Sequence, residues 1–236
     1  MKYRRSKLGV AWTVLTPLGL AVVVGSVYAL LFNTSPVVMI PLIFAGINPW
    51  TFMSGTADNA TITFPAAEGY IKQSTVSSQI FPLRTTLVNF VTLLYSVLTF
   101  FGIYLFISPD SFGPKMLMCI PGLVIMFVFS LGLANLTSMV NLYIRDFAPF
   151  QSLVLQGLFY ITPIIYDASM LKERGFSFIY EVNPFYYMLE VVRRPMLGQT
   201  LPSVRSYVVS ISLALMVFIT GVVVQMRARK QIAYML

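Results

Sequence analysis

The stretch MKYRRSKLGVAWTVLTPLGLAVVV, residues 1–24, places four cations among its first seven residues and then becomes apolar. The same order is typical of a secretory signal peptide, and SVYA at 26–29 is compatible with a cleavage site. The apolar run, however, continues to residue 32 and five further apolar runs follow it, whereas the apolar core of a signal peptide has roughly 7–15 residues. We therefore interpret the stretch as a retained first transmembrane helix.

The composition predicts an integral membrane protein. Of the 236 residues, 57% are hydrophobic and 10% are charged, whereas about 25% of residues are charged in soluble domains. The net charge of +8 comes from cations scattered in short pieces between apolar runs. This pattern favours a role in membrane orientation over a nucleic-acid interface, and we expect no nucleic-acid partner.

Six apolar runs are long enough to cross about 30 Å of hydrocarbon. They predict a single all-α transmembrane domain over residues 1–236 with six transmembrane helices. The fifth run is the shortest and contains Pro163, so we expect a kink or an early end there. The runs cover residues 10–32, 42–64, 86–107, 116–140, 149–166 and 206–226.

The distribution of cations orients these helices. With both termini in the cytoplasm, the inner segments hold ten Lys and Arg residues and the outer segments hold six, as the positive-inside rule requires. Five of the six outer cations lie in one long segment, residues 167–205. We therefore expect this segment to have a function of its own.

Several kinds of chemistry are excluded by what the sequence lacks. It has no phosphate-binding loop of the form G-x-x-x-x-G-K-[ST], so any ATP hydrolysis requires a partner subunit. It has no histidine, which removes the commonest general base and metal ligand. Cys119 is the only cysteine and allows no intramolecular disulfide. We expect no catalytic residue, cofactor site or metal site in this chain.

Asp58 is the one ionisable residue that the pattern places deep inside a span. An acid at such a depth indicates a functional site by default, for example a proton relay. Thr56, Asn59, Thr61 and Thr63 are close to it in the sequence, however, and they also allow a hydrogen-bonded polar patch inside the bundle.

Two connections on the expected cytoplasmic side alternate polar and apolar residues. Residues 65–85 can form one or two short helices on the membrane, and residues 141–148 place Arg145 beside Asp146. On the outer side, Asn183 and Pro184 suit the cap and first position of a helix reaching Arg194 before Pro195.

That outer helix is expected to be amphipathic and to lie at the membrane interface or to re-enter the membrane. Phe185, Met188, Leu189 and Val192 recur at helical spacing on one face. Glu190 can pair with Arg193 or Arg194. An ordinary surface loop is the alternative for this outer segment.

Three stretches together resemble one known family. They are YRRSKLGVAWTVLTPL at 3–18, NLYIRDFAPFQSLVLQGLFYITPIIY at 141–166 and NPFYYMLEVVRRPMLG at 183–198. In this order, with six spans, they are similar to the permease subunits of ABC-2 type polysaccharide exporters, which export O-antigen, capsule or teichoic acid. Family members usually carry an amphipathic helix before the arginine-rich motif, which here begins at residue 3, so we expect such a helix to precede the sequence given.

The resemblance implies a half-channel in the bacterial cytoplasmic membrane that works as a homodimer with two copies of an ATP-binding subunit, which carries the ATP and Mg²⁺. It implies that residues 65–85 and 141–148 are coupling segments, and that residues 167–205 form an extracytoplasmic gate of short helices. The expected contacts to the ATPase are Glu68, Lys72, Arg145 and Asp146. The expected gate residues are Asn183, Pro184, Phe185, Glu190, Arg193 and Arg194.

The implied substrate is a polysaccharide on a polyprenyl diphosphate or another lipid. Arg4, Arg5 and Lys7 are placed to meet an anionic headgroup, although setting the topology also explains them. Aromatic residues inside the spans could line a path for sugar, with core packing as the alternative. These are Tyr28, Phe32, Tyr95, Phe159 and Tyr160.

Three other functions remain open on the sequence alone. An ABC-2 permease for a drug or small lipid would have similar spans without the NPF-containing helix. An integral glycan-processing enzyme would need acids facing a site, and the acids of 167–205 are interleaved with cations, which favours salt pairing. A passive channel or secondary transporter would act without an ATPase.

Overall fold

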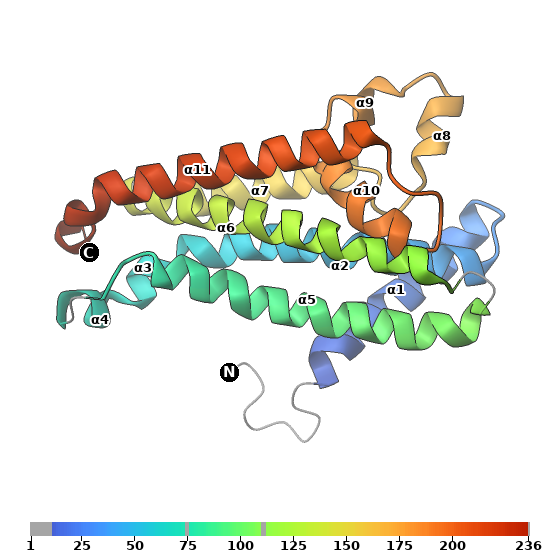
Figure 1. The fold of residues 1–236 in the computed structure, drawn as a ribbon, viewed down its shortest axis with the longest axis horizontal. Coiled ribbons are helices and arrows are strands. Elements are labelled where there is room, and N and C mark those ends of the chain that lie inside the picture. The colour runs from blue at the N-terminus through green and yellow to red at the C-terminus, as the bar shows by residue number, and fades with distance from the viewer. Residues whose placement is uncertain (1–10, 74–75, 110–111, 236) are drawn as a thin grey trace.

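The computed structural model describes residues 11–73, 76–109 and 112–235, and within these ranges the chain is helical without any strand. This confirms the predicted all-α class. The long helices lie side by side in one bundle (Figure 1). They are α1 (Trp12–Leu31), α2 (Pro36–Thr61), α5 (Ile80–Ile107), α6 (Cys119–Tyr143) and α11 (Val204–Met235).

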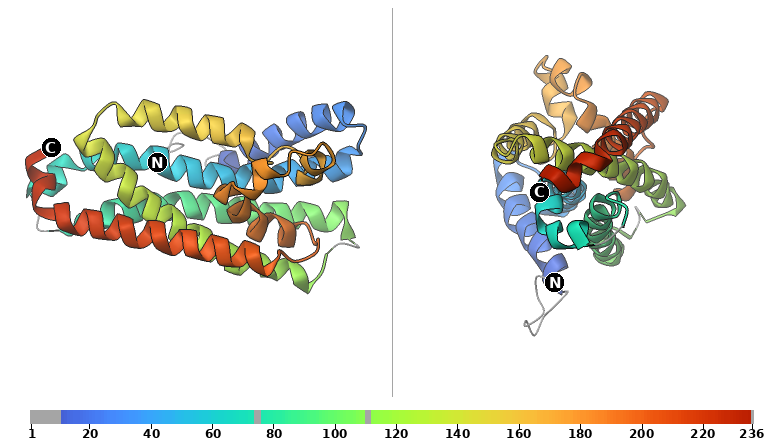
Figure 2. Two further views of the ribbon diagram at one scale, coloured as in Figure 1. Left: turned by 90° about the horizontal axis from the view of Figure 1, so that it is seen from above. Right: turned by 90° about the vertical axis from the view of Figure 1, so that its left-hand side faces the viewer.

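Shorter helices occupy the two ends of the bundle and one side of it. At one end are α3 (Thr63–Ala66) and α4 (Glu68–Gln73); at the other are the 3-10 helix η3 (Pro114–Met118), α8 (Ala168–Glu173), α9 (Phe178–Glu181) and α10 (Pro184–Met196). Between the two ends runs α7 (Phe147–Ile161) (Figure 2). The segments expected to couple and to gate are therefore at opposite ends of the molecule.

Five helices in the described part of the chain are long and apolar enough to cross a membrane. They correspond to the first, second, third, fourth and sixth predicted spans. The fifth, 149–166, corresponds to α7, which has 15 residues and is only about 22 Å long at 1.5 Å per residue. The helix ends at Ile161, two residues before Pro163, which agrees with the early end expected from this proline. A crossing by α7 stays a prediction, as does the orientation of the termini.

The centre of the bundle is α2, and its neighbours α1, α5 and α6 surround it. Of an 18-residue apolar stretch within each span, 72% is buried inside the protein in α2, against 17% in α1 and 17% in α11. The lower hydropathy of α2, 1.5 against 2.1 to 2.5 for the other spans, is consistent with this position. A helix that contacts other helices instead of lipid can carry polar residues, provided that they find partners.

The helices α6 and α11 cross in direct backbone contact. A Cβ atom at Gly132 would collide with the backbone of Phe218, and one at Gly221 would collide with the carbonyl oxygen of Gly132. The two helix backbones therefore touch at this point, which only glycine allows. Small residues let membrane helices approach closely enough for dispersion contacts to hold them together.

The packing of α10 covers more than the one apolar face that its sequence predicts, while its place at the membrane interface or within the membrane stays a prediction. Ten of its thirteen residues are buried, because α6, α11 and α2 all pack against it. It also continues through Pro195 to Met196 instead of ending at Arg194. In the last turn Pro195 removes only the hydrogen bond to the carbonyl of Val191, and that carbonyl lies against Gly122 on α6, where no side chain intervenes.

Candidate coupling and gate segments

The start of α10 is fixed by its own sequence. The side chain of Asn183 accepts a hydrogen bond from the backbone N–H of Phe185 at 3.0 Å, and Pro184 occupies the first helical position. This is the predicted arrangement of cap and proline. Phe185 extends inward and packs on the rings of Trp50 and Phe129, with ring centroids 5.7 Å apart in both cases.

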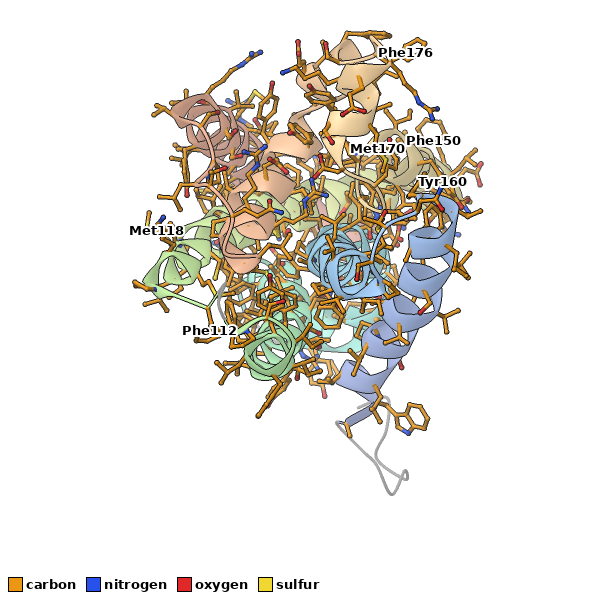
Figure 3. All side chains as sticks on the ribbon, turned by 90° about the vertical axis from the view of Figure 1, so that its right-hand side faces the viewer. Phe112, Met118, Phe150, Tyr160, Met170 and Phe176 are labelled. Carbon is orange, nitrogen blue, oxygen red and sulfur yellow. The ribbon has the colours of Figure 1, made fainter. Side chains whose placement is uncertain are left out.

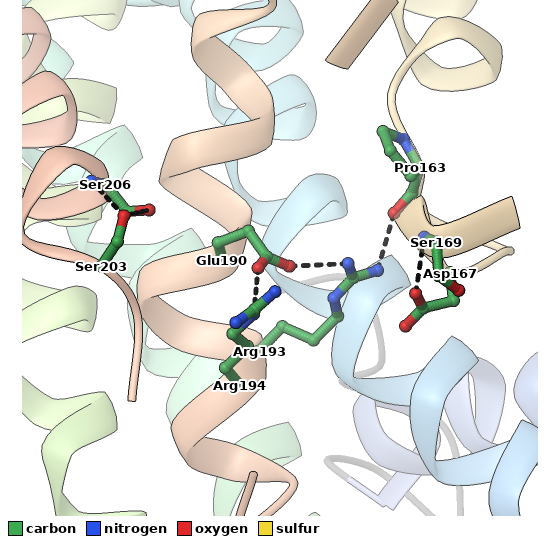
Figure 4. A network of polar contacts seen from close by, with 8 residues as sticks. All are labelled: Pro163, Asp167, Ser169, Glu190, Arg193, Arg194, Ser203 and Ser206. Carbon is green, nitrogen blue, oxygen red and sulfur yellow. Dashed lines mark hydrogen bonds and ion pairs between the residues drawn. The ribbon is translucent and has the colours of Figure 1, made fainter. Parts of the chain in front are cut away.

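Glu190 binds both of the arginines that follow it (Figure 4). One carboxylate oxygen accepts from Arg193 at 2.7 Å, and the other pairs with Nε of Arg194. The side chains of Glu190 and Arg193 are 5% and 3% exposed, whereas that of Arg194 is 37% exposed. The two cations thus share a single acid, and one of the pairs is almost completely removed from solvent.

Two hydrogen bonds connect α10 with the end of α7. The guanidinium of Arg193 donates to the carbonyl oxygen of Pro163 at 2.6 Å, in addition to its bond with Glu190. At the other end of α10, the Asn183 amide donates to the Thr162 hydroxyl at 2.8 Å. Residues 162 and 163 directly follow α7, so α10 holds the exit of α7 at two points. We call these two bonds the α7–α10 link.

The charges around α10 favour the ionised forms of Asp167 and Arg194. Burial would raise the pKa of Asp167, but hydrogen bonds from Ser169 and the charges of Arg193 and Arg194 outweigh it and lower the pKa. Burial would also lower the pKa of Arg194, and the neighbouring Glu190 reverses that effect and raises it. The cluster of 167, 190, 193 and 194 is therefore a balanced set of two anions and two cations.

The opposite end carries the two predicted coupling segments. Glu68 and Lys72 form an exposed ion pair at 2.7 Å on α4, and Arg145 and Asp146 are exposed in the turn between α6 and α7. Figure 2 shows both segments at this end of the bundle, near the last turns of α11. Residues 80–85, expected to belong to the first connection, are already the first turns of α5.

The turn between α6 and α7 is fixed by Asn141, which sequence reasoning missed. Its amide donates to the carbonyl of Thr61 at 2.9 Å, and its side-chain oxygen accepts from the N–H of Ala148 at 3.1 Å. One side chain on α6 therefore connects the end of α2 with the start of α7. No local pattern indicates this role, because its partners are 80 residues before it and seven residues after it.

Asp58 belongs to a hydrogen-bonded polar patch and is half-buried, so the prediction of a deeply buried acid is wrong. One carboxylate oxygen accepts from the Gln151 amide at 3.2 Å and from the Ser152 hydroxyl at 3.0 Å, both on α7. The position is one turn before the end of α2, where the span leaves the bundle centre. Asp58 thus fastens α2 to the first turns of α7.

The neighbours of Asp58 face another helix. Asn89 on α5 donates to the Thr56 hydroxyl at 3.2 Å and accepts from the amide of Asn59 at 3.4 Å. The hydroxyls of Thr63 and Thr85 lie 3.0 Å apart. The hydrogen-bonded polar patch, which the sequence allowed as the alternative to a functional acid at Asp58, is therefore present.

The aromatic residues expected to line a sugar path are not brought together. Tyr28 and Phe32 pack on each other on α1, with centroids 5.5 Å apart. On α7, Phe159 packs on Trp50 at 6.0 Å while Tyr160 is 66% exposed. Tyr95 lies exposed on α5. Within one chain these residues form no common lining.

The three cations of the opening stretch, Arg4, Arg5 and Lys7, lie outside the described residues. Their expected contact with a lipid headgroup therefore stays a prediction.

Comparisons with known proteins identify a family and two relatives. Residues 1–197 match the family described as ABC-2 type transporter. Two proteins from Klebsiella pneumoniae, both named O-antigen export system permease protein RfbA, are each 28% identical over 194 residues, covering 80% of this chain and 73% of the relative.

Proposed function

Because this chain belongs to the ABC-2 type transporter family, we propose that it is the permease subunit of an ATP-driven exporter of lipid-linked polysaccharide in the bacterial cytoplasmic membrane. The name of its relatives, O-antigen export system permease, supports an O-antigen-like substrate. The missing phosphate-binding loop supports a separate ATP-binding subunit, which brings ATP and Mg²⁺. We further propose two copies of each subunit, with the channel between the two permeases.

The observation that carries the proposal is the fixation of α7 at both ends. Its start is bonded through Asn141 and Asp58, beside the exposed turn that holds Arg145 and Asp146. Its exit is bonded to α10 through the α7–α10 link. A displacement of the turn by an ATPase can therefore reach the opposite end through one short helix.

In this mechanism, the ATP-binding subunits contact α4 and the turn after α6, and the two ATPase states differ in how they hold these segments. Only such a difference in binding can shift the equilibrium between closed and open permease. At the outer end, the α7–α10 link connects α10 to the exit of α7, and we assign α10 as the movable part of the gate. The α8 and α9 arm projects beyond the bundle, with Phe176 at its outer edge (Figure 3).

Disruption of the gene tests this function in cells. Export should stop while glycan synthesis continues, so that lipid-linked glycan accumulates on the cytoplasmic side. The same accumulation should follow when the ATPase partner loses the lysine of its phosphate-binding loop. Loss of synthesis itself would contradict a transport role and favour an enzyme.

The coupling contact has its own test, with a control at the opposite end. Arg145→Glu reverses the charge of the exposed turn, and it should abolish co-purification of the ATP-binding subunit. Lys172→Glu makes the same change in α8, where Lys172 is also exposed, and should leave co-purification intact. Equal recovery of the ATP-binding subunit with both variants would refute the proposal that the α6–α7 turn contacts it.

A further inference from the structure

A cavity of about 310 Å³ lies along α7, between this helix and α6. After their common turn the two helices diverge, and α2 forms the floor between them (Figure 2). The walls are the side chains of Leu133, Leu136 and Val140 from α6 and of Val154, Leu155 and Leu158 from α7. The cavity ends at Phe185 of α10. Most of the side chains along its length are apolar.

Two polar side chains, Thr137 and Gln151, interrupt this lining. The Thr137 hydroxyl is already bonded to the carbonyl oxygens of Ala57 and Ala134, whereas Gln151, near the end that holds the α6–α7 turn, keeps an unpaired atom. Gln151 is 7% exposed, and its amide nitrogen is bonded to Asp58. Its oxygen Oε1 has no hydrogen-bond partner among the described residues. An unpaired buried carbonyl of this kind costs about 1–3 kcal/mol, so a donor from outside the chain would stabilise it. The cavity therefore has a polar end near Gln151 and an apolar end near Phe185.

The position of Gln151 relates this polarity to a membrane. It is four residues into α7, so it lies about 6 Å from the start of the helix at 1.5 Å per residue. The predicted crossing of α7 puts this level where the helix leaves the hydrocarbon and meets the headgroup region. The apolar part of the cavity then extends from that level towards the middle of the bilayer.

The size and lining of the cavity limit what can occupy it. Water requires two to four polar partners, and one free acceptor in an apolar lining does not provide them. An α-helix of a second copy is about 10 Å wide and is too large for this volume. A single hydrocarbon chain fits, and the side chains at the entrance are exposed and apolar: Phe150 is 62% and Val154 is 42% exposed. Figure 3 shows Phe150 at the periphery of the bundle.

We propose that this cavity binds part of one acyl chain of a bilayer phospholipid, with the headgroup at the level of Gln151 and the chain running along α7 towards Phe185. The headgroup supplies the donor for the Gln151 oxygen, as ethanolamine or glycerol can. The bound chain fills the space between α7 and α6, and so makes the position of α7 depend on the lipid. This inference requires a membrane protein but does not depend on the exported substrate.

Trp50 provides the signal for a direct test. It is 5% exposed, and its ring packs on Phe185 at the end of the cavity, with centroids 5.7 Å apart. Trp12→Phe leaves Trp50 as the only tryptophan, because the chain has two. In nanodiscs of phosphatidylglycerol with brominated acyl chains, a chain inside the cavity should quench Trp50, although bulk lipid cannot reach it.

Two variants fill the cavity from opposite walls, Val154→Phe and Leu136→Phe. Each should reduce quenching at least twofold relative to the Trp12→Phe parent. Leu153→Phe is the matched control, because Leu153 is 68% exposed and does not line the cavity; it should be quenched as the parent is. Variants are compared only if they elute as single species and melt like the parent.

Two results would overturn the proposal. Quenching that is unchanged in both filling variants would mean that lipid reaches Trp50 by another route or not at all. Quenching that is present in discs with one copy of the chain but lost in discs with two copies would assign the cavity to side chains of the second copy. We expect equal quenching in both kinds of disc.

Discussion

Replacing Glu190 by glutamine tests whether the charge cluster of α10 is as buried as the structure has it. The side chains of Glu190 and Arg193 are 5% and 3% exposed, and their nearest oxygen and nitrogen atoms are 2.7 Å apart. Glutamine keeps the shape and one acceptor oxygen but removes the negative charge. Arg193 is then a buried cation without a carboxylate, and breaking a buried pair in this way costs about 3–5 kcal/mol. We expect the free energy of unfolding to fall by about this amount.

The two arginines supply the comparison. Arg194 pairs with the same carboxylate but is 37% exposed, so Arg194→Met should cost no more than about 1 kcal/mol. Arg193→Met removes the buried cation and leaves Glu190 paired with Arg194, so it should cost less than Glu190→Gln. Because Glu190 and Arg193 are in contact, the free-energy change of the double variant Glu190→Gln/Arg193→Met should differ from the sum of the two single changes by about 0.5–3 kcal/mol.

The assay is reversible unfolding by SDS in mixed micelles, followed by tryptophan fluorescence. All four variants are measured under the same conditions as the wild-type chain. If Glu190→Gln and Arg194→Met differ by less than about 1 kcal/mol, which is the range of exposed pairs, then the pair is not buried and the reasoning fails.

Three further predictions use other parts of the chain. Gly132→Ala should lower the free energy of unfolding by about 1–3 kcal/mol through overpacking, because its Cβ would collide with the backbone of α11. Gly157→Ala is the control: its Cβ meets nothing within 4 Å, so it should stabilise α7 by up to about 1 kcal/mol. Equal effects of the two variants in SDS unfolding would refute the close crossing of α6 and α11. The lowered pKa of Asp167 means that its stabilisation is complete above its ordinary pKa of 3.8 and is lost as the pH falls through the lower folded value. The difference in Tm between wild type and Asp167→Asn should therefore shrink below about pH 4, and a difference that stays constant down to pH 2 would contradict it. Asp58→Asn keeps the acceptor oxygen that Gln151 and Ser152 use, so export measured in cells should remain near the wild-type level. A folded variant that exports nothing would instead support the hypothesis of a proton relay.

The sequence was sufficient for features that depend on neighbouring residues. Composition and long apolar runs predicted the membrane helices, because these are properties of each segment. The cap and first residue of α10 were predicted correctly, since an Asn–Pro pair acts within one turn. The pairing of Glu190 with Arg193 and Arg194 follows from spacings of three and four residues.

Features that depend on distant residues could not be predicted in the same way. Periodicity gave α10 one apolar face but could not show that α2, α6 and α11 cover its other sides. Arg193 and Pro163 are 30 residues apart, and Asn141 and Thr61 are 80 apart. No local pattern indicates which carbonyl a side chain will reach over such separations.

The predicted aromatic lining is not formed within one chain, and for a channel between two copies it stays a prediction. Residue type marked Tyr28, Phe159 and Tyr160, but the direction of each ring depends on how its helix is rotated in the bundle.

Reconstitution of the purified permease and its ATP-binding partner in proteoliposomes tests the central claim most directly. Lipid-linked glycan placed in the outer leaflet, on the side of the ATPase, is followed by a glycosidase trapped in the lumen. Our account predicts cleavage only when both subunits and hydrolysable ATP are present, and none with an ATPase that lacks its phosphate-binding lysine. Cleavage with the permease alone, without ATPase or ATP, would contradict the account and identify a passive channel or flippase.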